Sequence, residues 1–319
     1  MDIIYDFPQE ENNERYYIAL GNFDGVHIGH QELITTMVTD ARNKNSKTLV
    51  LTFDPHPAKV LAPKGAPKLL VPPGVKADLI SKLGVDMLAL LPFDRNIARL
   101  TPREFIENVL IKYFRPLALY VGYNYTFGDK GEGTPEQLED YGRVLGYEVK
   151  ITPPVSINDM PISSTLIREH LSKGDIPFAK ECLGRWPFVK GKVIPGNGLG
   201  RKLGFPTANM SLDNDIQMPS RGVYVGYTCV GGNNYHSIAN VGVKPTVSPG
   251  QKPTMEVHLL NVERDLYGKT ITFSFRDRIR GERKFNSLNE LKSQIAGDAE
   301  HARRMAADYK KSTYFPGRI

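Results

Sequence analysis

The chain has 319 residues, a net charge of +6 at neutral pH and two cysteines. This length suits two domains of ordinary size. No apolar run is long enough to span a membrane, the acidic start lacks the pattern of a signal peptide, and two cysteines make no disulfide framework, so we expect a cytoplasmic protein. The positive charge is spread along the chain without a basic stripe, which argues against nucleic acid and fits phosphorylated small molecules.

The first half of the chain alternates short apolar runs with amphipathic stretches. Residues 16–20, 49–53, 87–91 and 117–121 read as strands that are buried on both faces. Helical spacing links Leu33, Ile34, Met37, Val38 and Ala41. Capping boxes at residues 101–104 and 134–137 each carry proline at the first helical position and predict two further helix starts. This rhythm favours a parallel sheet with helices on both faces.

From residue 188 onward the pattern changes to strands that are punctuated by glycine. The runs at 188–194, 222–230, 235–243, 254–262 and 270–279, with a Gly231-Gly232 turn, predict a small antiparallel barrel or sandwich. A final helix is capped by residues 287–290, and its expected apolar stripe is Leu288, Leu291, Ile295, Ala302 and Met305. We therefore expect two domains, residues 1–184 and 185–319.

The stretch GNFDGVHIGH, residues 21–30, follows the first expected strand and leads into a helix. In open α/β sheets ligands bind beyond the carboxyl ends of strands, beside helix N-termini. Two imidazoles there, His27 and His30, can donate hydrogen bonds to phosphate oxygens and stabilise charge as a phosphoanhydride breaks. Two alternatives stay open, namely structural histidines and a metal site with His56 as third ligand.

A second stretch, ISSTLIR, carries phosphate-binding groups at another helix start. Ser163, Ser164 and Thr165 offer hydroxyl and N–H groups, and Arg168 offers a planar fork that suits phosphate. By itself the stretch could equally be an ordinary helix cap. Its combination with the histidine pair in a βαβ frame is the stronger indication of a nucleotide site.

The second half has a motif of its own in GKVIPGNGLGRKLGFPTANM, residues 191–210. Its glycines can fold over phosphates, although the ending of a Walker A loop is absent. In an extended segment residues two apart face the same side, so Thr207 and Asn209 can present two oxygens to Mg²⁺. Glu256 is a candidate general base for a hydroxyl nucleophile. The alternatives are a glycine-rich turn and a surface glutamate.

The motifs in order resemble a known enzyme family. GNFDGVHIGH, FDPHP, VGYNYTFG and ISSTLIR are similar to FMN adenylyltransferases, which have an α/β nucleotidyltransferase fold of Rossmann-like type with a parallel sheet. GFPTAN, RGVYVG, IANVGVKPT, EVHLL and DLYGK are similar to riboflavin kinases, which have a small antiparallel β-barrel, here followed by a C-terminal helix. The fusion resembles the bacterial bifunctional riboflavin kinase/FAD synthetases.

The resemblance implies two activities, with ATP, riboflavin and FMN as substrates and Mg²⁺ as cofactor. It implies His27, His30 and Glu256 as catalytic residues. For ATP in the adenylyltransferase it implies Gly21, Phe23, Asp24, His27, His30, Asn124, Ser163, Ser164, Thr165 and Arg168. For ATP in the kinase it implies Gly191, Gly200, Lys202, Gly204, Thr207 and Asn209, the last two also as metal ligands. For flavin it implies Gly222, Val223, Tyr224, Asn240 and Glu256.

We expect small-molecule partners only, with neither nucleic acid nor membrane, and a monomer or weak oligomer. Two other functions compete with this prediction. One is a nucleotidyltransferase for a different acceptor, such as nicotinamide mononucleotide or phosphopantetheine, with the barrel as an accessory domain. The other is a flavin-binding regulator that consumes no ATP.

Overall fold

The computed structural model describes residues 1–9, 14–196, 198–244, 252–262 and 264–309. The chain forms two compact units, Met1–Ser164 and Thr165–Ile319. The second unit takes in helices α7 (Ser164–Lys173), apart from its first residue, and α8 (Ile176–Leu183), because Ser220 N donates to Leu171 O at 3.0 Å and α8 packs on the barrel. The division along the chain thus falls earlier than the expected boundary at residue 184. The expected boundary stays a prediction of where the segment needed for the first activity ends.

The first unit contains one parallel sheet. Its strands lie in the order β1 (Asp2–Ile4), β4 (Met87–Leu91), β3 (Lys47–Phe53), β2 (Tyr16–Leu20), β5 (Pro116–Gly122) and β6 (Glu148–Thr152). The four predicted strands are confirmed. The two edge strands were not predicted, because both are short and β6 is not buried along its length.

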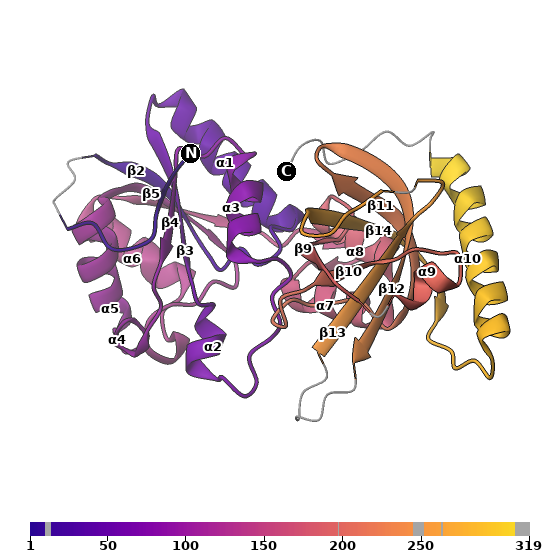
Figure 1. Cartoon of the computed structure of the whole chain (residues 1–319). Coiled ribbons are helices and arrows are strands. Elements are labelled where there is room, and N and C mark those ends of the chain that lie inside the picture. Colours follow the sequence, from indigo (N-terminus) through magenta and orange to yellow (C-terminus); the bar gives the residue numbers. More distant parts are fainter. Residues whose placement is uncertain (10–13, 197, 245–251, 263, 310–319) are drawn as a thin grey trace. The chain divides into compact units, whose positions relative to one another are not determined.

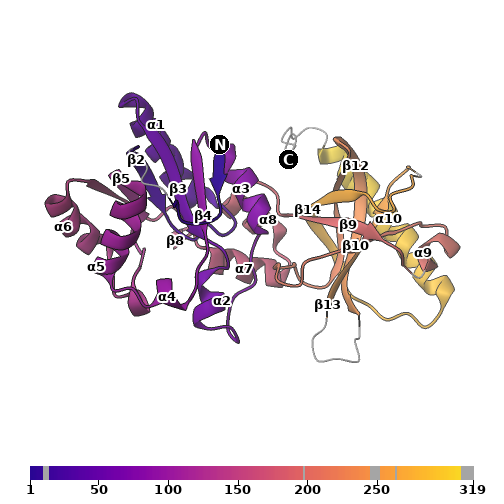
Figure 2. The same ribbon diagram turned by 60° about the vertical axis from the view of Figure 1, so that its left-hand side comes forward.

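Helices cover both faces of this sheet (Figures 1 and 2). On one face, α1 (Ile28–Asn43) and α3 (Pro73–Ser81) pack in one core cluster, and α1 buries the predicted set Leu33, Ile34, Met37, Val38 and Ala41. On the other face lie α5 (Pro102–Phe105), the π-helix η1 (Ile106–Phe114) and α6 (Pro135–Leu145). Smaller elements are α2 (Pro57–Leu61), α4 (Arg95–Ala98), η2 (Asp129–Gly131) and the hairpin β7 (Ser156–Ile157)–β8 (Met160–Pro161).

The segment after the first capping box differs from the α-helix that the sequence predicts. The box itself is present, with Thr101 and Glu104 satisfying each other's backbone N–H groups. From Ile106 the chain continues as a π-helix. The buried side chains in this segment are Phe105, Ile106, Val109, Leu110 and Phe114. Each of them has another buried side chain four or five residues away, which suits the wider turn of a π-helix.

The second unit is a closed six-stranded barrel, which decides between the barrel and the sandwich. Its order is β10 (Ala208–Ser211), β13 (Lys252–Leu259), β12 (Asn233–Lys244), β11 (Gly222–Val230), β14 (Thr270–Gly281) and β9 (Phe188–Ile194). Gly231 and Gly232, at φ of 56° and 83°, make the predicted hairpin turn. The short helix α9 (Leu199–Lys202) precedes β10.

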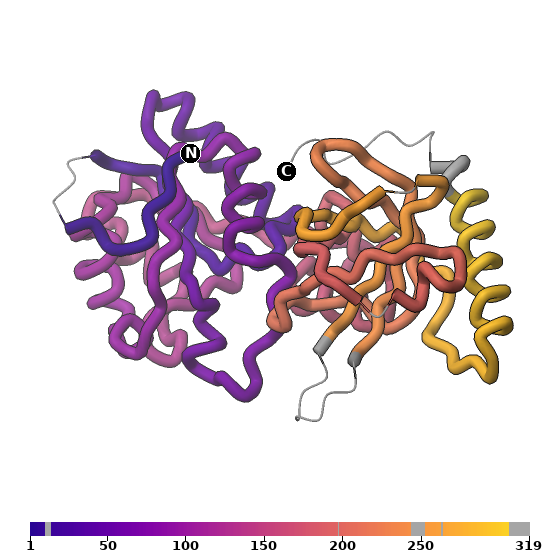
Figure 3. Tube along the Cα trace, viewed as in Figure 1, coloured from indigo at the N-terminus to yellow at the C-terminus, as the bar shows by residue number. Residues whose placement is uncertain are grey.

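Helix α10 (Leu288–Tyr309) packs against the barrel (yellow in Figures 1 and 3). Ser287 caps it, because its Oγ accepts from Glu290 N at 3.1 Å. The predicted stripe is correct at Ala302 and Met305 but wrong at Leu288, which is exposed in the first turn. Fully buried Ala299 takes part in the contact instead. No helix in the described ranges is long and apolar enough to cross a membrane.

Candidate functional site

The predicted phosphate-binding turn lies where the strand order of the sheet reverses. The chain leaves β2 toward β3 and β4 on one side, then returns to β5 and β6 on the other. Residues 21–30 follow β2, and Asn124 follows its neighbour β5. The carboxyl ends of strands at such a switch point form the usual ligand crevice of an open α/β sheet.

The two histidines form one unit at the start of α1. His27 is the N-cap, and its Nδ1 accepts a hydrogen bond from His30 N at 3.3 Å. The two rings stack with centroids 3.5 Å apart, and the Phe23 ring meets His30 edge-on at 5.2 Å. Because Nδ1 of His27 is an acceptor, the neutral ring carries its proton at Nε2 and can donate from there. The hydrogen bond to Nδ1 therefore leaves Nε2 as the His27 nitrogen that can donate to a phosphate at the helix N-terminus.

The turn before these histidines is tied to distant segments. The Asp24 carboxylate accepts from Leu70 N at 2.9 Å, and the Asp24 carbonyl accepts from Ser164 Oγ, also at 2.9 Å. The histidine and ISSTLIR motifs therefore meet through Ser164, with Ser163 beside it. Thr165 and Arg168, one and four residues farther along α7, belong to the second unit, and their contact with nucleotide stays a prediction.

The metal alternative for these histidines finds no support in the described part of the chain. There, no three His, Cys, Asp or Glu side chains are placed to hold a metal ion. His56 instead caps α2, since its Nδ1 accepts from Ala58 N at 3.2 Å.

In the barrel, five side chains form one row across five strands. Asn209 of β10 stands opposite Glu256 of β13, which stands opposite Asn240 of β12. Val223 of β11 continues the row and pairs with Arg280 of β14. Directly opposed residues of antiparallel strands project to the same face. The register thus gathers four of the predicted residues, including the candidate base, on one face.

This face of the barrel lines a cavity of about 390 Å³. The row forms part of its wall, and residues of α10 and of the segment before it form another part. Phe285 lies against two guanidinium groups, those of Arg280 and Arg283, at 5.7 and 5.5 Å from the ring centroid. Arg280 is held by Asp298 of α10 at 2.8 Å. The cavity combines aromatic and aliphatic surface with a few fixed polar groups, which is typical of small-molecule sites.

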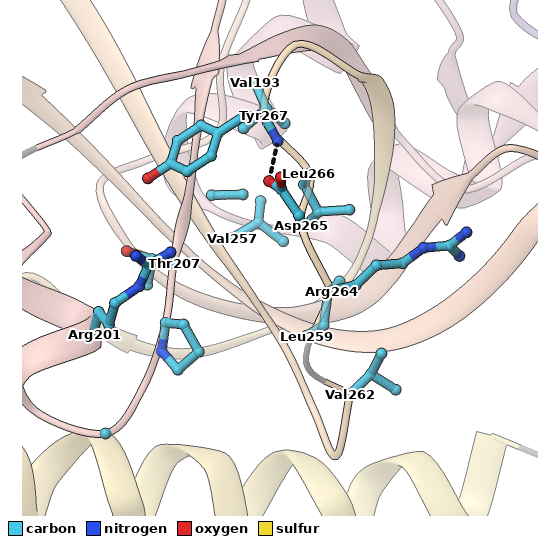
Figure 4. Close-up of a pocket in the computed structure, with 13 residues that line it drawn as sticks. Val193, Arg201, Thr207, Val257, Leu259, Val262, Arg264, Asp265, Leu266 and Tyr267 are labelled. Atoms are coloured by element: carbon cyan, nitrogen blue, oxygen red, sulfur yellow. Dashed lines mark hydrogen bonds between the residues drawn. The ribbon is translucent and has the colours of Figure 1, made fainter.

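A second cavity, of about 500 Å³, lies next to the first. Its lining includes two arginines, Arg201 and Arg264, and residues 265–267 of the DLYGK motif. Figure 4 shows Arg201, Thr207 and Tyr267 along one side and Arg264 along the other. Asp265 is engaged locally, because its Oδ1 accepts from Tyr267 N at 3.0 Å. Two cations at its rim suit a polyphosphate.

Thr207 joins the two cavities. It lines both of them, and its Oγ1 donates to Glu256 Oε2 at 3.2 Å. The preceding Pro206 is fixed by His258 Nδ1, which lies 2.8 Å from the Pro206 carbonyl oxygen and donates to it. Burial lowers the pKa of His258, so this ring is neutral at pH 7 and carries its proton at Nδ1. The predicted metal ligand and the predicted base thus meet where the cavities adjoin.

Comparison with known proteins assigns both halves. The family model described as FAD synthetase matches residues 9–166, and the model described as riboflavin kinase matches residues 183–306. The chain is 37% identical over 309 residues to the bifunctional riboflavin kinase/FMN adenylyltransferase of Bacillus subtilis, covering 95% of this chain and 96% of that one. This chain belongs to the bifunctional riboflavin kinase/FMN adenylyltransferase family. The Escherichia coli K12 protein of that name is 38% identical, covering 90% and 91%.

One solved structure resembles the whole fold. It is a protein from Streptococcus pneumoniae described as a macrolide-efflux protein, with a TM-score of 0.85 and 33% identity, and the match covers 94% of this chain and 99% of that one. The family assignment rests on the two family models and the curated relatives, whose names agree with each other.

In this riboflavin kinase/FMN adenylyltransferase, some of the residues predicted to bind ATP or flavin do not line the two described cavities. Gly191 lies in β9, where a Cβ would fall on the Ser211 carbonyl oxygen, and Lys202 is exposed in α9. Tyr224 is fully buried on the opposite face to Val223, and its hydroxyl donates to Ser220 O at 2.5 Å. At Gly222 a Cβ would fall on the Arg280 carbonyl oxygen. These positions have evident structural reasons, and their ligand roles stay predictions. Gly200 and Gly204 each line one cavity.

Other residues at the sites were missed by the sequence analysis. Arg280, Phe285 and Asp298 line the smaller cavity, and Lys76 lies beneath the adenylyltransferase turn. Arg280 belongs to a run of alternate arginines in β14, with Arg276 and Arg278, and this alternation was a usable signal. Lys76, a single lysine among the apolar residues of α3, gives a much weaker sequence signal.

Proposed function

We infer that this chain phosphorylates riboflavin with ATP to give FMN, and then transfers the adenylyl group of a second ATP to FMN to give FAD. The observation that supports the first step most directly is the position of Thr207 between two cavities, in contact with Glu256. A kinase needs a nucleotide pocket and an acceptor pocket that adjoin at the transferred phosphoryl group. Family membership supports both steps.

In the kinase, the larger cavity takes ATP and the smaller takes riboflavin. Arg201 and Arg264 suit the triphosphate, while Phe285 and the apolar wall suit an isoalloxazine ring. Glu256 accepts the proton of the riboflavin 5′-hydroxyl as its oxygen attacks the terminal phosphorus, and ADP leaves. Glu256 is half-buried in the row, and the hydrogen bond from Thr207 Oγ1 holds its carboxylate in place.

The residues around Thr207 also fit Mg²⁺, which prefers oxygen ligands and keeps substrate phosphates as partners. The Thr207 hydroxyl donates its hydrogen bond to Glu256, so the lone pairs of its oxygen stay available for a cation. Asn209 lies two residues on in the same row as Glu256 and can add an amide oxygen. A bound Mg²⁺ would neutralise charge on the phosphates. Chelation with EDTA should abolish FMN formation, and added Mg²⁺ should restore it.

In the adenylyltransferase, an oxygen of the FMN phosphate attacks the α-phosphorus of ATP. The bond to the pyrophosphate oxygen breaks, and pyrophosphate leaves. His27 and His30, stacked at the N-terminus of α1, bind the phosphates and stabilise the charge that develops on the leaving group. Asn124 and Ser163 complete this site on our proposal.

The acceptor specificity of the first unit separates this function from other nucleotidyltransferases. Purified protein should release pyrophosphate from MgATP with FMN, and release little with nicotinamide mononucleotide or phosphopantetheine. Pyrophosphate release with one of those acceptors but not with FMN would contradict the proposal. Flavin binding without any ATP consumption would support the alternative of a regulator.

A further inference from the structure

Helix α3 carries a buried lysine, Lys76, which contacts the turn formed by residues 21–30. Lys76 is only 8% exposed, and its helix neighbours Val75, Ala77 and Ile80 are buried and apolar. Lysine is almost never fully buried in proteins unless its charge is paired. Its position therefore calls for an explanation that packing alone does not give.

The ammonium of Lys76 holds the backbone of the turn. Its Nζ donates to the Asn22 carbonyl oxygen at 3.2 Å and to Thr52 Oγ1 at 3.1 Å. The Thr52 hydroxyl in turn donates to the same Asn22 oxygen at 3.1 Å. Asn22 lies between β2 and the stacked histidines. Two donors thus fix one carbonyl of the turn that presents His27 and His30.

Neither of these acceptors carries a charge. The described residues offer Lys76 no ion pair, and the two carboxylates that act on it through space are Asp24, in the turn, and Asp54, after β3. Burial outweighs their effect and lowers the pKa of Lys76 to about 8. Replacing a buried charge by an apolar side chain of similar size is often neutral or stabilising. A retained buried cation beside a phosphate-binding turn suggests that an anionic substrate completes its charge balance.

We propose that Lys76 is a positioning residue for adenylyl transfer, whose buried ammonium fixes the Asn22 turn and whose charge is balanced by the bound nucleotide phosphates. This inference deepens the proposed FMN adenylyltransferase activity and rests on it. Bound phosphates stabilise the protonated amine, and by linkage the protonated amine favours phosphate binding. Adenylyl transfer therefore requires Lys76 in its charged form. Adenylyl transfer should then decline as pH rises past the pKa of this group.

The test compares Lys76→Met with Lys82→Met, which removes the same charge from an exposed position at the end of α3. Lys76→Met should lower kcat/KM for FAD formation from FMN by about 10- to 100-fold, comparable to the loss of a group that orients the ligands of a metal site. Its melting temperature should be unchanged or higher, and its riboflavin phosphorylation unchanged. Wild type and Lys82→Met should show a fall in kcat/KM around pH 8 that Lys76→Met lacks.

A loss of adenylyl transfer that accompanies a lower melting temperature and an unaltered pH profile would assign Lys76 a structural role only. Unchanged kcat/KM in Lys76→Met would also overturn the proposal. If Lys76→Met does not fold, Lys76→Gln, which keeps a donor N–H without the charge, takes the same comparison. Absence of FAD formation in the wild type would instead contradict the proposed function itself.

Discussion

At the scale of single residues, the proposed kinase mechanism depends on Glu256 as its base. Glu256→Gln keeps the shape of the side chain but removes the base, so kcat for riboflavin phosphorylation should fall by about 10²- to 10⁴-fold. FAD formation from supplied FMN should stay close to that of the wild type. Both rates can be measured by chromatography of the flavins, with Glu300→Gln, at an exposed position of α10, as the control. A near-normal kinase rate in Glu256→Gln would refute the base assignment.

His30 makes the matching prediction for the other site. Loss of its ring in His30→Ala removes a group that we propose binds phosphate, together with one half of the stack at the start of α1. FAD formation from FMN should fall by about 10²- to 10³-fold, as for loss of a transition-state donor. Riboflavin phosphorylation should be preserved, because Glu256 and Thr207 lie in the other unit. Equal loss of both activities would point to general unfolding.

Lys76 also predicts a dependence of stability on pH. Burial lowers the pKa of Lys76 from its ordinary value of 10.5 to about 8, so between these values the unfolded chain binds more protons than the folded chain. The free energy of unfolding therefore increases as the pH rises through this range. Relative to Lys76→Met, the substrate-free wild type should therefore gain about 3 kcal/mol between pH 7 and pH 10.5. Denaturant titrations of both proteins at several pH values measure this. A difference that does not vary with pH would contradict it.

The sequence predicted these residues unevenly, for physical reasons. Alternation along a strand predicts that Thr207 and Asn209 share a face, and both line the smaller cavity. The register of β10 with β13 then places Glu256 opposite Asn209, and the roles of the three residues stay predictions. Tyr224 is one residue from Val223 and so lies on the other face. Lys76 was not predicted because the burial of one helix position depends on tertiary packing.

At the scale of elements, strands and helices with a clear period were predicted well. β2, β4, β9 and β11 match their expected bounds, because continuous apolar runs and glycine turns mark them. The π-helix was not predicted, since a capping box followed by apolar residues is typical of an α-helix of 3.6 residues per turn. The first turn of α10 was misjudged at Leu288 because an apolar side chain at a helix end can face solvent.

The contact between α10 and the barrel makes a prediction at this scale. Asp298 is 3% exposed and pairs with Arg280 in the wall of the smaller cavity. Asp298→Asn removes the charge partner of the partly buried Arg280 guanidinium. This change should lower the free energy of unfolding of the barrel unit by about 3 kcal/mol. The KM for riboflavin should rise, with adenylyl transfer unaffected. Glu300→Gln, which loses only an exposed pair with Arg303, is the control, and an equal effect there would contradict the account.

At the scale of the whole molecule, the chain divides into two units and matches two family models, and the order of motifs along the chain anticipated both matches. The point of division was harder to predict, because α7 and α8 lie between the two family matches and contact the barrel. Contacts between distant residues decide such a boundary, and glycine and proline patterns do not record them. The monomeric or weakly oligomeric state and the cytoplasmic location stay predictions.

The most direct test of two independent sites is a mixing experiment with riboflavin and MgATP. Glu256→Gln alone should leave riboflavin unchanged, and His30→Ala alone should accumulate FMN. An equimolar mixture should form FAD, because FMN made by His30→Ala is adenylylated by Glu256→Gln. If the mixture forms no FAD while each variant retains its own remaining activity, the account of two sites linked by free FMN is contradicted.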